Sequence, residues 1–287
     1  RCYWQKCYEI PEGDKNSKGR AIQNMLNIEP DDAINAVLRI KNFGDEEFLN
    51  SHYVVFATKQ GIIKKTCLNQ YKNVRAAGVI AININEGDEV VAVRLTNGHN
   101  ELLLANRNGR AVRFDENDVR TMGRVATGVI GMRLDGGDDE VVGMVCVNDP
   151  NTETIMVVSE NGYGKRSEVE DYRKTLRGAK GVKTLAVTEK TGRLVAIKVV
   201  TDENDLMIIN KSGILIRLKV ADVRVMGRNT QGVRLINLTK KNDVIASVCK
   251  VMHAQAEEEG VEEAQIIDEE PEEAIDTPLI ETPDNNE

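Results

Sequence analysis

The sequence predicts an all-β protein built as a propeller-like ring of small sheets. Three observations favour this fold: a segment of about 50 residues recurs four times, each copy holds short runs rich in valine, isoleucine and leucine, and helical periodicity is weak throughout. Repeats of this length with about four strands each have the size of propeller blades. In such blades every small sheet packs on its neighbours around an axis.

Each unit opens with an apolar run, a glycine turn and a second strand. The turn glycines are separated by 48, 53 and 51 residues, and they are Gly61, Gly109, Gly162 and Gly213. Gln, Asn, Asn and Ser precede them. Asn-Gly and Ser-Gly turns favour positive φ, which glycine adopts without a steric penalty. We therefore predict a β-hairpin at the start of each unit and a structural role for its glycine.

A second glycine and a closing strand complete each unit. The second glycines follow the first by 17 or 19 residues, and they are Gly78, Gly128, Gly181 and Gly232. Apolar runs such as "EVVAVRLT" and "EVVGMVCV" then end the units. The opening residues fit the same frame, with Gly19 as second glycine, "AINAVLRI" as closing strand and the hairpin glycine extrapolated to position 0. We expect four full units, preceded by one that the chain enters midway.

The charge distribution divides the chain into a basic body and an acidic tail. Residues 255–287 hold 14 acidic residues and no lysine or arginine, which leaves 32 acidic residues against all 38 cations elsewhere, although the net charge is −8. A segment with so much charge and so few aromatics does not bury enough apolar surface to offset its ordering entropy. We predict a folded domain over 1–253 and a disordered tail over 254–287, which competes for the anion that the body binds.

A membrane span, a disulfide framework and a zinc site are not expected. The apolar runs are strand-sized and no basic-then-apolar leader opens the chain, so we expect a cytoplasmic protein without a membrane span. The five cysteines lack a CxxC pair and the three histidines lie far apart, which argues against disulfide and zinc frameworks. We therefore predict no metal site.

No catalytic constellation can be named either. "GYGKRS" lacks the spacing and the following helix of a phosphate-binding loop. Tyr71 and Tyr172 fill a slot that Ile10, Val119 and Val223 hold in the other units, so we interpret both tyrosines as packing residues. Histidines and cysteines show no acid, base or nucleophile at a recurring position.

Lysine or arginine returns at two slots of every full unit. One cation stands four positions after the hairpin glycine, and another stands three or four positions before the second glycine. Radial repetition would turn these slots and their neighbours into a basic band around the rim. The predicted rim cations are Lys64, Lys65, Arg75, Arg110, Arg113, Arg124, Lys165, Arg166, Arg173, Lys174, Arg177, Lys180, Lys183, Arg217, Arg228 and Arg234.

Duplex DNA is the polyanion that suits such a rim. Aromatics make up only 4% of the chain and do not recur beside the cations, so a stacking platform for splayed bases is missing. No recognition helix or zinc finger is evident. Phosphate contacts would dominate, with steep salt dependence, and a curved rim could hold bent DNA. The alternative is that the cations only solvate sheet edges and prevent edge pairing.

The sequence resembles the C-terminal domain of the bacterial DNA gyrase A subunit, part of a type II topoisomerase. The likeness covers nearly all of residues 1–253 and is strongest in "NGYGKRS" at 161–167, "RGAKGV" at 177–182 and "VMGRNTQGV" at 225–233; the acidic tail is similar too. The resemblance implies a β-pinwheel, a ring of four-stranded blades that exchange strands. It also implies a domain that wraps duplex DNA so that ATP-driven strand passage introduces negative supercoils.

The resemblance further implies partners and absences. The remainder of the A subunit would combine with the B subunit in an A2B2 holoenzyme of the bacterial cytoplasm, in which ATP and magnesium act outside this chain. The family normally has six units and a Gln-Arg-Arg-Gly-Gly-Lys-Gly heptapeptide, which is missing here. We infer a fragment that begins beyond the heptapeptide, binds DNA and does not support supercoiling or cleavage by itself.

Two other functions are consistent with the sequence. One is the related C-terminal domain of topoisomerase IV, which usually has fewer or less regular blades. The other is a propeller-like scaffold for protein interactions. Salt-dependent binding to linear duplex, weakened by charge reversal at Arg113, Arg166 and Arg217, is the expected sign of a DNA-binding rim.

Overall fold

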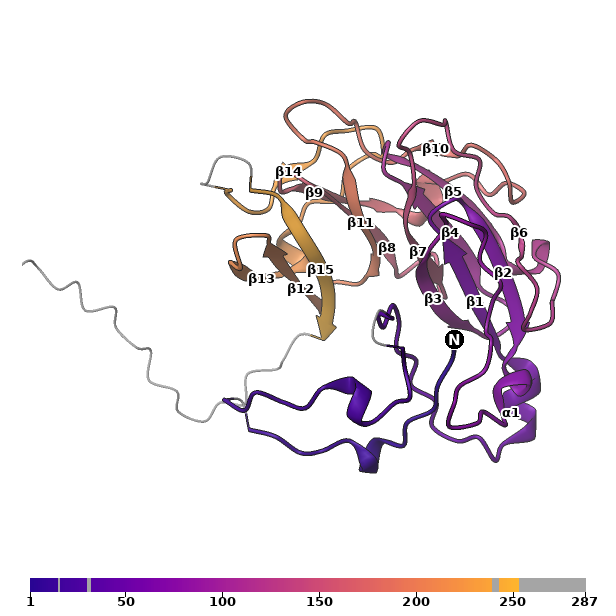
Figure 1. Cartoon of the computed structure of the whole chain (residues 1–287). Helices are drawn as coiled ribbons and strands as arrows, with labels where there is room; N and C mark the ends of the chain where they lie inside the picture. The colour runs from indigo at the N-terminus through magenta and orange to yellow at the C-terminus, as the bar shows by residue number, and fades with distance from the viewer. Residues whose placement is uncertain (15, 30–31, 239–242, 253–287) are drawn as a thin grey trace, which may run out of the picture. The chain divides into compact units, whose positions relative to one another are not determined.

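The computed structural model describes residues 1–14, 16–29, 32–238 and 243–252. They lie in one compact unit, Arg1–His253, whose regular secondary structure is mostly β-strand (Figure 1). The predicted disordered tail, 254–287, lies outside the described residues. Four small antiparallel sheets follow one another in chain order, and we call them blades 1 to 4.

Each of the first three blades takes three strands from its own unit and one short strand from the next unit. Blade 1 has the order β3 (Val90–Thr96), β1 (Tyr53–Thr58), β2 (Ile62–Cys67), β6 (Val129–Ile130). Blade 2 has the order β7 (Val141–Val147), β4 (Glu101–Asn106), β5 (Arg110–Asp115), β10 (Val182–Lys183). Blade 3 has the order β11 (Leu194–Val200), β8 (Thr154–Ser159), β9 (Tyr163–Glu168), β14 (Val233–Arg234). This strand exchange is the β-pinwheel arrangement that the resemblance implied.

Blade 4 contains three strands in the described residues, in the order β15 (Ile245–Met252), β12 (Asn204–Asn210), β13 (Leu215–Lys219). The closing strands β3, β7, β11 and β15 contact one another in this order. They form the inner edges of the blades, so the exchanged strands β6, β10 and β14 lie at the opposite, outer edges.

The two recurring glycines have the positive φ that their turns require. Gly109 ends the tip between β4 and β5 with φ of 75°, as predicted for a hairpin glycine. Gly181 has φ of 78° and lies against the backbone of β5, where a Cβ would overlap the carbonyl oxygen of Ala111. The second glycines therefore allow the exchanged strand to approach the preceding blade.

The opening segment follows the repeat in its strand pairing but not in its closing strand. Cys2 pairs with Val79 through two main-chain hydrogen bonds of 2.8 and 2.9 Å, in the register that joins Ile63 to Val129 and Ala111 to Val182 in the blades. This pairing agrees with a hairpin glycine extrapolated to position 0.

The predicted closing strand "AINAVLRI" of the opening unit is wrong, because residues 33–40 have no strand. In every blade the closing strand pairs with the first strand of its own unit, whereas residues 33–40 have no such strand beside them among the described residues. The segment packs on blade 1 instead, where Leu38, Ile40 and Phe43 cover its core and the Asn35 amide donates to the Val90 carbonyl at 3.1 Å.

Short helices connect the strands. A 3-10 helix follows the second strand of each unit: η3 (Leu68–Tyr71), η4 (Glu116–Asp118), η5 (Val169–Asp171) and η6 (Val220–Asp222). The opening segment contains η1 (Cys7–Glu9) and η2 (Ile22–Asn24), and α1 (Glu46–Ser51) precedes blade 1. The Asp45 carboxylate caps α1 by accepting from the Phe48 amide at 2.9 Å.

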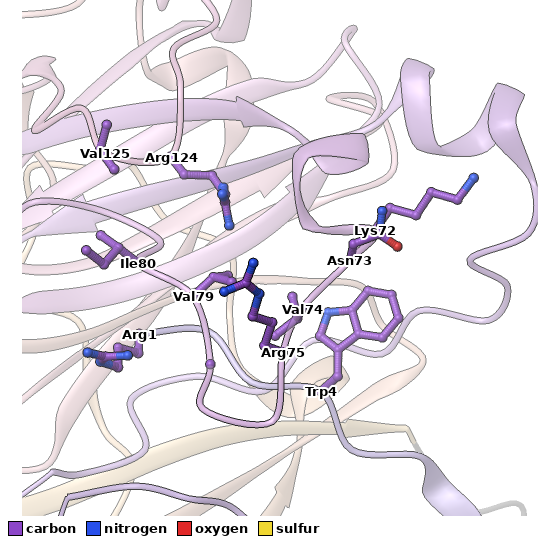
Figure 2. Close-up of a pocket in the computed structure, with 11 residues that line it drawn as sticks. Arg1, Trp4, Lys72, Asn73, Val74, Arg75, Val79, Ile80, Arg124 and Val125 are labelled. Atoms are coloured by element: carbon purple, nitrogen blue, oxygen red, sulfur yellow. The ribbon is translucent and has the colours of Figure 1, made fainter.

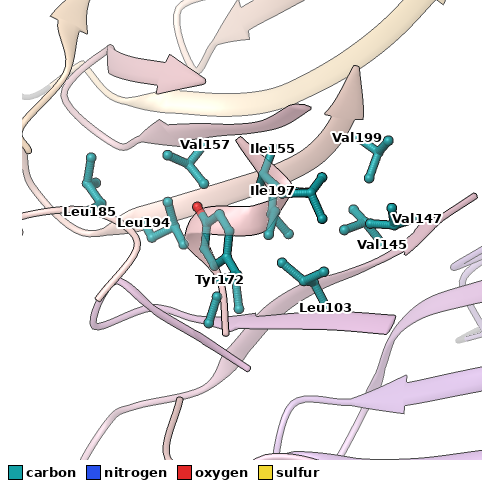
Figure 3. Packing of buried hydrophobic residues seen from close by; sticks show 13 residues of the cluster. Leu103, Val145, Val147, Ile155, Val157, Tyr172, Leu185, Leu194, Ile197 and Val199 are labelled. Atoms are coloured by element: carbon teal, nitrogen blue, oxygen red, sulfur yellow. The ribbon is translucent and has the colours of Figure 1, made fainter. Parts of the chain in front are cut away.

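The hydrophobic core lies between successive blades. One cluster joins blades 2 and 3 and contains Leu103, Val145, Ile155 and Val157, with Tyr172 packed among them (Figure 3). Tyr172 is fully buried and Tyr71 is 3% exposed, as expected for packing residues. Burial raises the pKa of both hydroxyls to about 12. Because both faces of a middle blade are covered, its central strands are buried on both sides.

Candidate nucleic-acid interface

The cation slot after the hairpin glycine faces the next blade. Arg113 on β5 is 5% exposed. Its guanidinium donates to the carbonyl of Val169 in η5 at 2.9 Å and to the carbonyl of Tyr172, directly after η5, at 3.0 Å. It also pairs with Glu101 at 2.5 Å and Glu170 at 2.9 Å. Burial lowers the pKa of Arg113, but these carboxylates outweigh burial and leave its pKa above the usual value. Arg113 thus fastens blade 2 to blade 3.

The equivalent side chains of blades 1 and 3 are also internal. Lys65 is 2% exposed and pairs with the buried Glu116 at 2.9 Å, with its ammonium 4.3 Å from the centre of the Tyr53 ring. Arg166 is 8% exposed, donates to the Val223 carbonyl at 2.6 Å and pairs with Asp202.

The predicted exposed rim is therefore wrong for five cations: Lys64, Lys65, Arg113, Lys165 and Arg166 are all buried. Strands β5 and β9 lie between two blades, and β2 lies in blade 1 between blade 2 and the opening segment, so their central residues do not reach solvent on either face. Arg217 on β13 differs, because alternate residues of this strand in blade 4 are exposed; its side chain is 45% exposed and pairs with Asp205 at 2.7 Å.

The cation slot before the second glycine lies farther out. Arg177 is half-buried and donates to the Asp118 and Ile130 carbonyls of the preceding unit at 2.9 and 3.1 Å. Arg228 repeats this contact one blade later, with the Asp171 and Lys183 carbonyls. These guanidinium groups donate to main-chain carbonyls and to no carboxylate in the described part of the chain, so their charges are not neutralised there.

A third recurring cation was missed by the sequence reasoning. Lysine or arginine stands 11 residues after every hairpin glycine, as Lys72, Arg120, Arg173 and Arg224, of which only Arg173 was predicted. The three arginines are exposed, and no described carboxylate forms an ion pair with them; Lys72 pairs with Glu46. The constant 11-residue spacing was the signal that could have revealed this slot.

Both outer slots lie on segments that run along blade edges. We call residues 72–80, 120–130, 173–183 and 224–234 the outer segments. Residues 121, 174 and 225 each form a parallel bridge with the second strand of the preceding blade, at Lys65, Arg113 and Arg166. The exchanged strand then continues along that strand. Consequently the cations of these three segments follow the edges opposite the inner strands.

The other predicted cations fall into two groups. Four are paired with carboxylates: Arg110 and Lys180 with Asp135, Lys174 with Glu101 and Asp115, and Arg217 with Asp205. Seven have no carboxylate partner among the described residues, namely Arg75, Arg124, Arg173, Arg177, Lys183, Arg228 and Arg234. Arg234 packs on the Tyr163 ring, 5.6 Å from its centre.

An open depression of about 760 Å³ lies at the outer edge of blade 1. Arg1, Arg75 and Arg124 line it together with the Trp4 ring (Figure 2). A smaller depression of about 100 Å³ lies at the corresponding edge of blade 2, lined by Arg173 and Lys180 among others. The outer segments thus border shallow, cation-lined surfaces at two successive blades.

Other kinds of site find no support in the described residues. No group of three or more metal-ligating side chains occurs among them. No helix in the described ranges has both the length and the apolar composition needed to cross a bilayer.

Recurring units and exchanged edge strands define the class: a β-pinwheel repeat domain, here with recurring cations on its outer segments. A family described as DNA gyrase C-terminal domain, β-propeller, matches residues 1–41, 52–97, 100–148, 153–201 and 204–249. The chain belongs to this family, the C-terminal domains of DNA gyrase A. The five matched stretches coincide with the opening partial unit and the four blades.

Individual proteins agree with this assignment. The DNA gyrase A subunit of Staphylococcus aureus (strain NCTC 8325 / PS 47) is 40% identical over the whole chain, which spans 34% of that protein. The C-terminal domain of DNA topoisomerase IV superposes with a TM-score of 0.74 at 30% identity, covering 82% of this chain and 71% of that one. The DNA gyrase A C-terminal domain superposes with 0.71 at 27% identity, covering 87% and 78%.

Proposed function

We propose that this domain binds duplex DNA along its outer segments and wraps it, as the C-terminal part of a gyrase A subunit in a bacterial type II topoisomerase. The partners would be the B subunit together with the remainder of the A subunit, in the cytoplasm. ATP hydrolysis and strand cleavage would belong to other parts of the holoenzyme, so this chain alone would be inactive.

The observation that carries the proposal is the repeated pair of outer cations. The slot 11 residues after the hairpin glycine and the slot before the second glycine hold lysine or arginine in all four units. Seven of these eight side chains have no carboxylate partner in the described residues. Cations that recur at a fixed place on successive blades, and whose charge no described carboxylate neutralises, suit the regularly spaced phosphates of a duplex.

A matched pair of triple variants tests this interface. Arg120→Gln, Arg173→Gln and Arg224→Gln together remove three outer cations, while Lys41→Gln, Lys211→Gln and Lys250→Gln remove three exposed cations that lie outside the outer segments. Binding to linear duplex DNA is measured by fluorescence anisotropy over a range of KCl concentrations. The outer variant should lower the slope of log K against log[KCl] by about 2.7, at 0.9 per phosphate contact, and weaken binding about five-hundredfold at 0.1 M salt.

Equal effects of the two triple variants would show that only net charge matters and would refute the outer segments as the interface. Salt-independent binding, or none, by the unmodified domain would favour the protein-interaction scaffold instead.

The structural match to topoisomerase IV favours a second candidate, the corresponding domain of that enzyme. The full-length protein that contains this chain, combined with its ATPase partner on positively supercoiled circular DNA, distinguishes the two. ATP-dependent negative supercoils support gyrase, whereas relaxation without negative supercoiling supports topoisomerase IV.

A further inference from the structure

Two lysines are completely buried without a carboxylate partner in the described residues. Lys64 on β2 and Lys165 on β9 each stand three residues after the hairpin glycine and are 0% exposed. The Lys64 ammonium donates to the Ala81 carbonyl at 2.5 Å and to the Arg124 carbonyl. The Lys165 ammonium donates to the Gly227 carbonyl at 2.7 Å and to the Arg228 carbonyl. In both blades the lysine therefore holds the main chain of an outer arginine from the next unit.

The blades do not need a lysine at this position. Val112 and Ile216 occupy it in blades 2 and 4. Removing an ammonium from water without a counter-ion is costly, and here burial lowers the pKa of Lys64 and Lys165 to about 8. The charge of Arg124 lowers the pKa of Lys64 further, whereas for Lys165 Asp171 raises the pKa and Arg228 lowers it. Core packing alone would favour an aliphatic side chain.

The outer segment 173–183, which lies along the strand that contains Val112, is held by other contacts. Lys174 pairs there with Glu101 and Asp115 at 3.1 and 3.0 Å. The Gly178 amide donates to the Gly131 carbonyl at 2.6 Å. Thus each of the three outer segments that cover a blade is fixed at the edge, two by a buried lysine and one by surface ion pairs and a main-chain hydrogen bond.

We propose that Lys64 and Lys165 are positioning residues for DNA binding, which fix the backbone at Arg124 and Arg228 so that these guanidinium groups face the phosphates of a wrapped duplex. The proposal rests on the function proposed above. The two lysines would not contact DNA themselves, because both are buried; they would hold the arginines that do.

The test uses substitutions that the fold already accommodates at this position. Lys64→Val and Lys165→Ile copy blades 2 and 4, and Val112→Ile is the matched control at the same slot of blade 2. Amide hydrogen exchange is followed over residues 123–127 and 227–231, and the affinity for linear duplex DNA is measured against salt. Thermal unfolding confirms that each variant is folded.

We expect exchange about tenfold faster in the segment that has lost its lysine, and there alone. Affinity should fall about three- to tenfold for each lysine variant, and the salt slope by about one, because roughly one phosphate contact is lost. Val112→Ile should leave both readouts unchanged.

The two readouts separate failure of this inference from failure of the proposed function. Unchanged exchange in both lysine variants overturns the positioning role, whether or not the domain binds DNA. Faster exchange with unchanged affinity, in a domain that binds DNA, overturns it as well. A parent domain without salt-dependent binding refutes the proposed function, and with it the role of the lysines in binding.

Discussion

The recurring cations of this chain have two different structural roles, depending on the slot of the repeat that they occupy. Arg113 and Arg166 lie between blades and hold main-chain carbonyls of the following unit, while Arg120 and Arg224 are exposed to solvent on outer segments. The first kind joins blades, and the second kind is free to meet phosphate. Charge reversal at Arg113 or Arg166 would therefore report on folding rather than on DNA binding.

Arg113→Gln should destabilise the domain. It leaves two carbonyls of the next blade without their donor, and it leaves Glu101, which is 17% exposed, with Lys174 as its remaining cation partner. Removing one partner of a buried pair costs about 3–5 kcal/mol. Chemical unfolding measures the loss. The salt dependence of DNA binding by the folded fraction should stay unchanged, whereas Arg120→Gln should alter that dependence without lowering stability. The reverse pattern would contradict the division into joining and outer cations.

The buried lysines should give the fold an unusual pH dependence. Their pKa of about 8 lies below the unfolded value near 10.5, so the unfolded chain binds more protons between these pH values and stability rises with pH through this window. Arg124 and Tyr71 face Lys64, and Asp171 and Arg228 face Lys165. The melting temperature of the parent should increase relative to that of Lys64→Val/Lys165→Ile from about pH 7 to about 9.5; a constant difference would contradict these pKa values.

The exchanged strand is the element that links successive units. β6, β10 and β14 are only two residues long, yet each pairs with the preceding blade next to a glycine of positive φ. Cys2 and Val79 repeat the same pairing ahead of blade 1. Because the pairing is short, its stability depends on how closely the glycine approaches the neighbouring backbone.

Two glycines with similar φ should respond differently to alanine. Gly181 has φ of 78° and a Cβ there would overlap the Ala111 carbonyl, whereas Gly213 has φ of 87° and open space around it. Gly213→Ala should cost about 1 kcal/mol for the left-handed backbone alone. Gly181→Ala adds overlap with backbone and should cost about 3 kcal/mol.

Denaturant unfolding compares these two glycine variants, and hydrogen exchange at β5 and β10 should increase for Gly181→Ala only. Similar losses in both variants would mean that the close approach of the exchanged strand contributes little.

At the scale of the whole molecule, charge is unevenly distributed along the chain. Residues 1–254 carry about +6, whereas residues 255–287 carry 14 acidic residues without a lysine or arginine. A polyanionic segment joined to a basic domain lowers its attraction for DNA at low salt. The outer cations should therefore attract DNA more strongly when residues 255–287 are removed.

Deletion of residues 255–287 should tighten binding to linear duplex DNA. The effect should be largest at low salt and shrink as salt screens the charges. Anisotropy titrations of the two forms at several KCl concentrations measure it, and a variant with the same tail length and the acidic residues changed to Gln or Asn controls for length. Unchanged or weaker binding of the truncated form at low salt would contradict the prediction.

Wrapping should change DNA topology. If the outer segments bend the duplex along the blade edges, ligation of a nicked circle in the presence of the domain should trap a shifted linking number that grows with the ratio of protein to DNA. Bending about 20–30 base pairs by 40–90° costs roughly 1–6 kcal/mol, which several phosphate contacts can offset. Binding without a linking-number shift would indicate attachment without wrapping.

The sequence by itself determined the repeat, its glycine turns, the all-β fold and the family. The turns and strands could be predicted because a hairpin glycine such as Gly109 and the apolar runs beside it depend on residues that are close in sequence. The family could be recognised from the motifs themselves. The register of the opening unit also followed from spacing, as the pairing of Cys2 with Val79 confirms.

Only the tertiary structure decided which cations are exposed. Arg113 and Arg120 both recur at a constant distance from the hairpin glycine, so spacing does not distinguish them. Their difference arises because β5 is covered on both faces by packed blades, while the outer segment lies at a blade edge. Exposure is a property of what packs against a residue from elsewhere in the chain, and a repeat pattern alone does not contain that information.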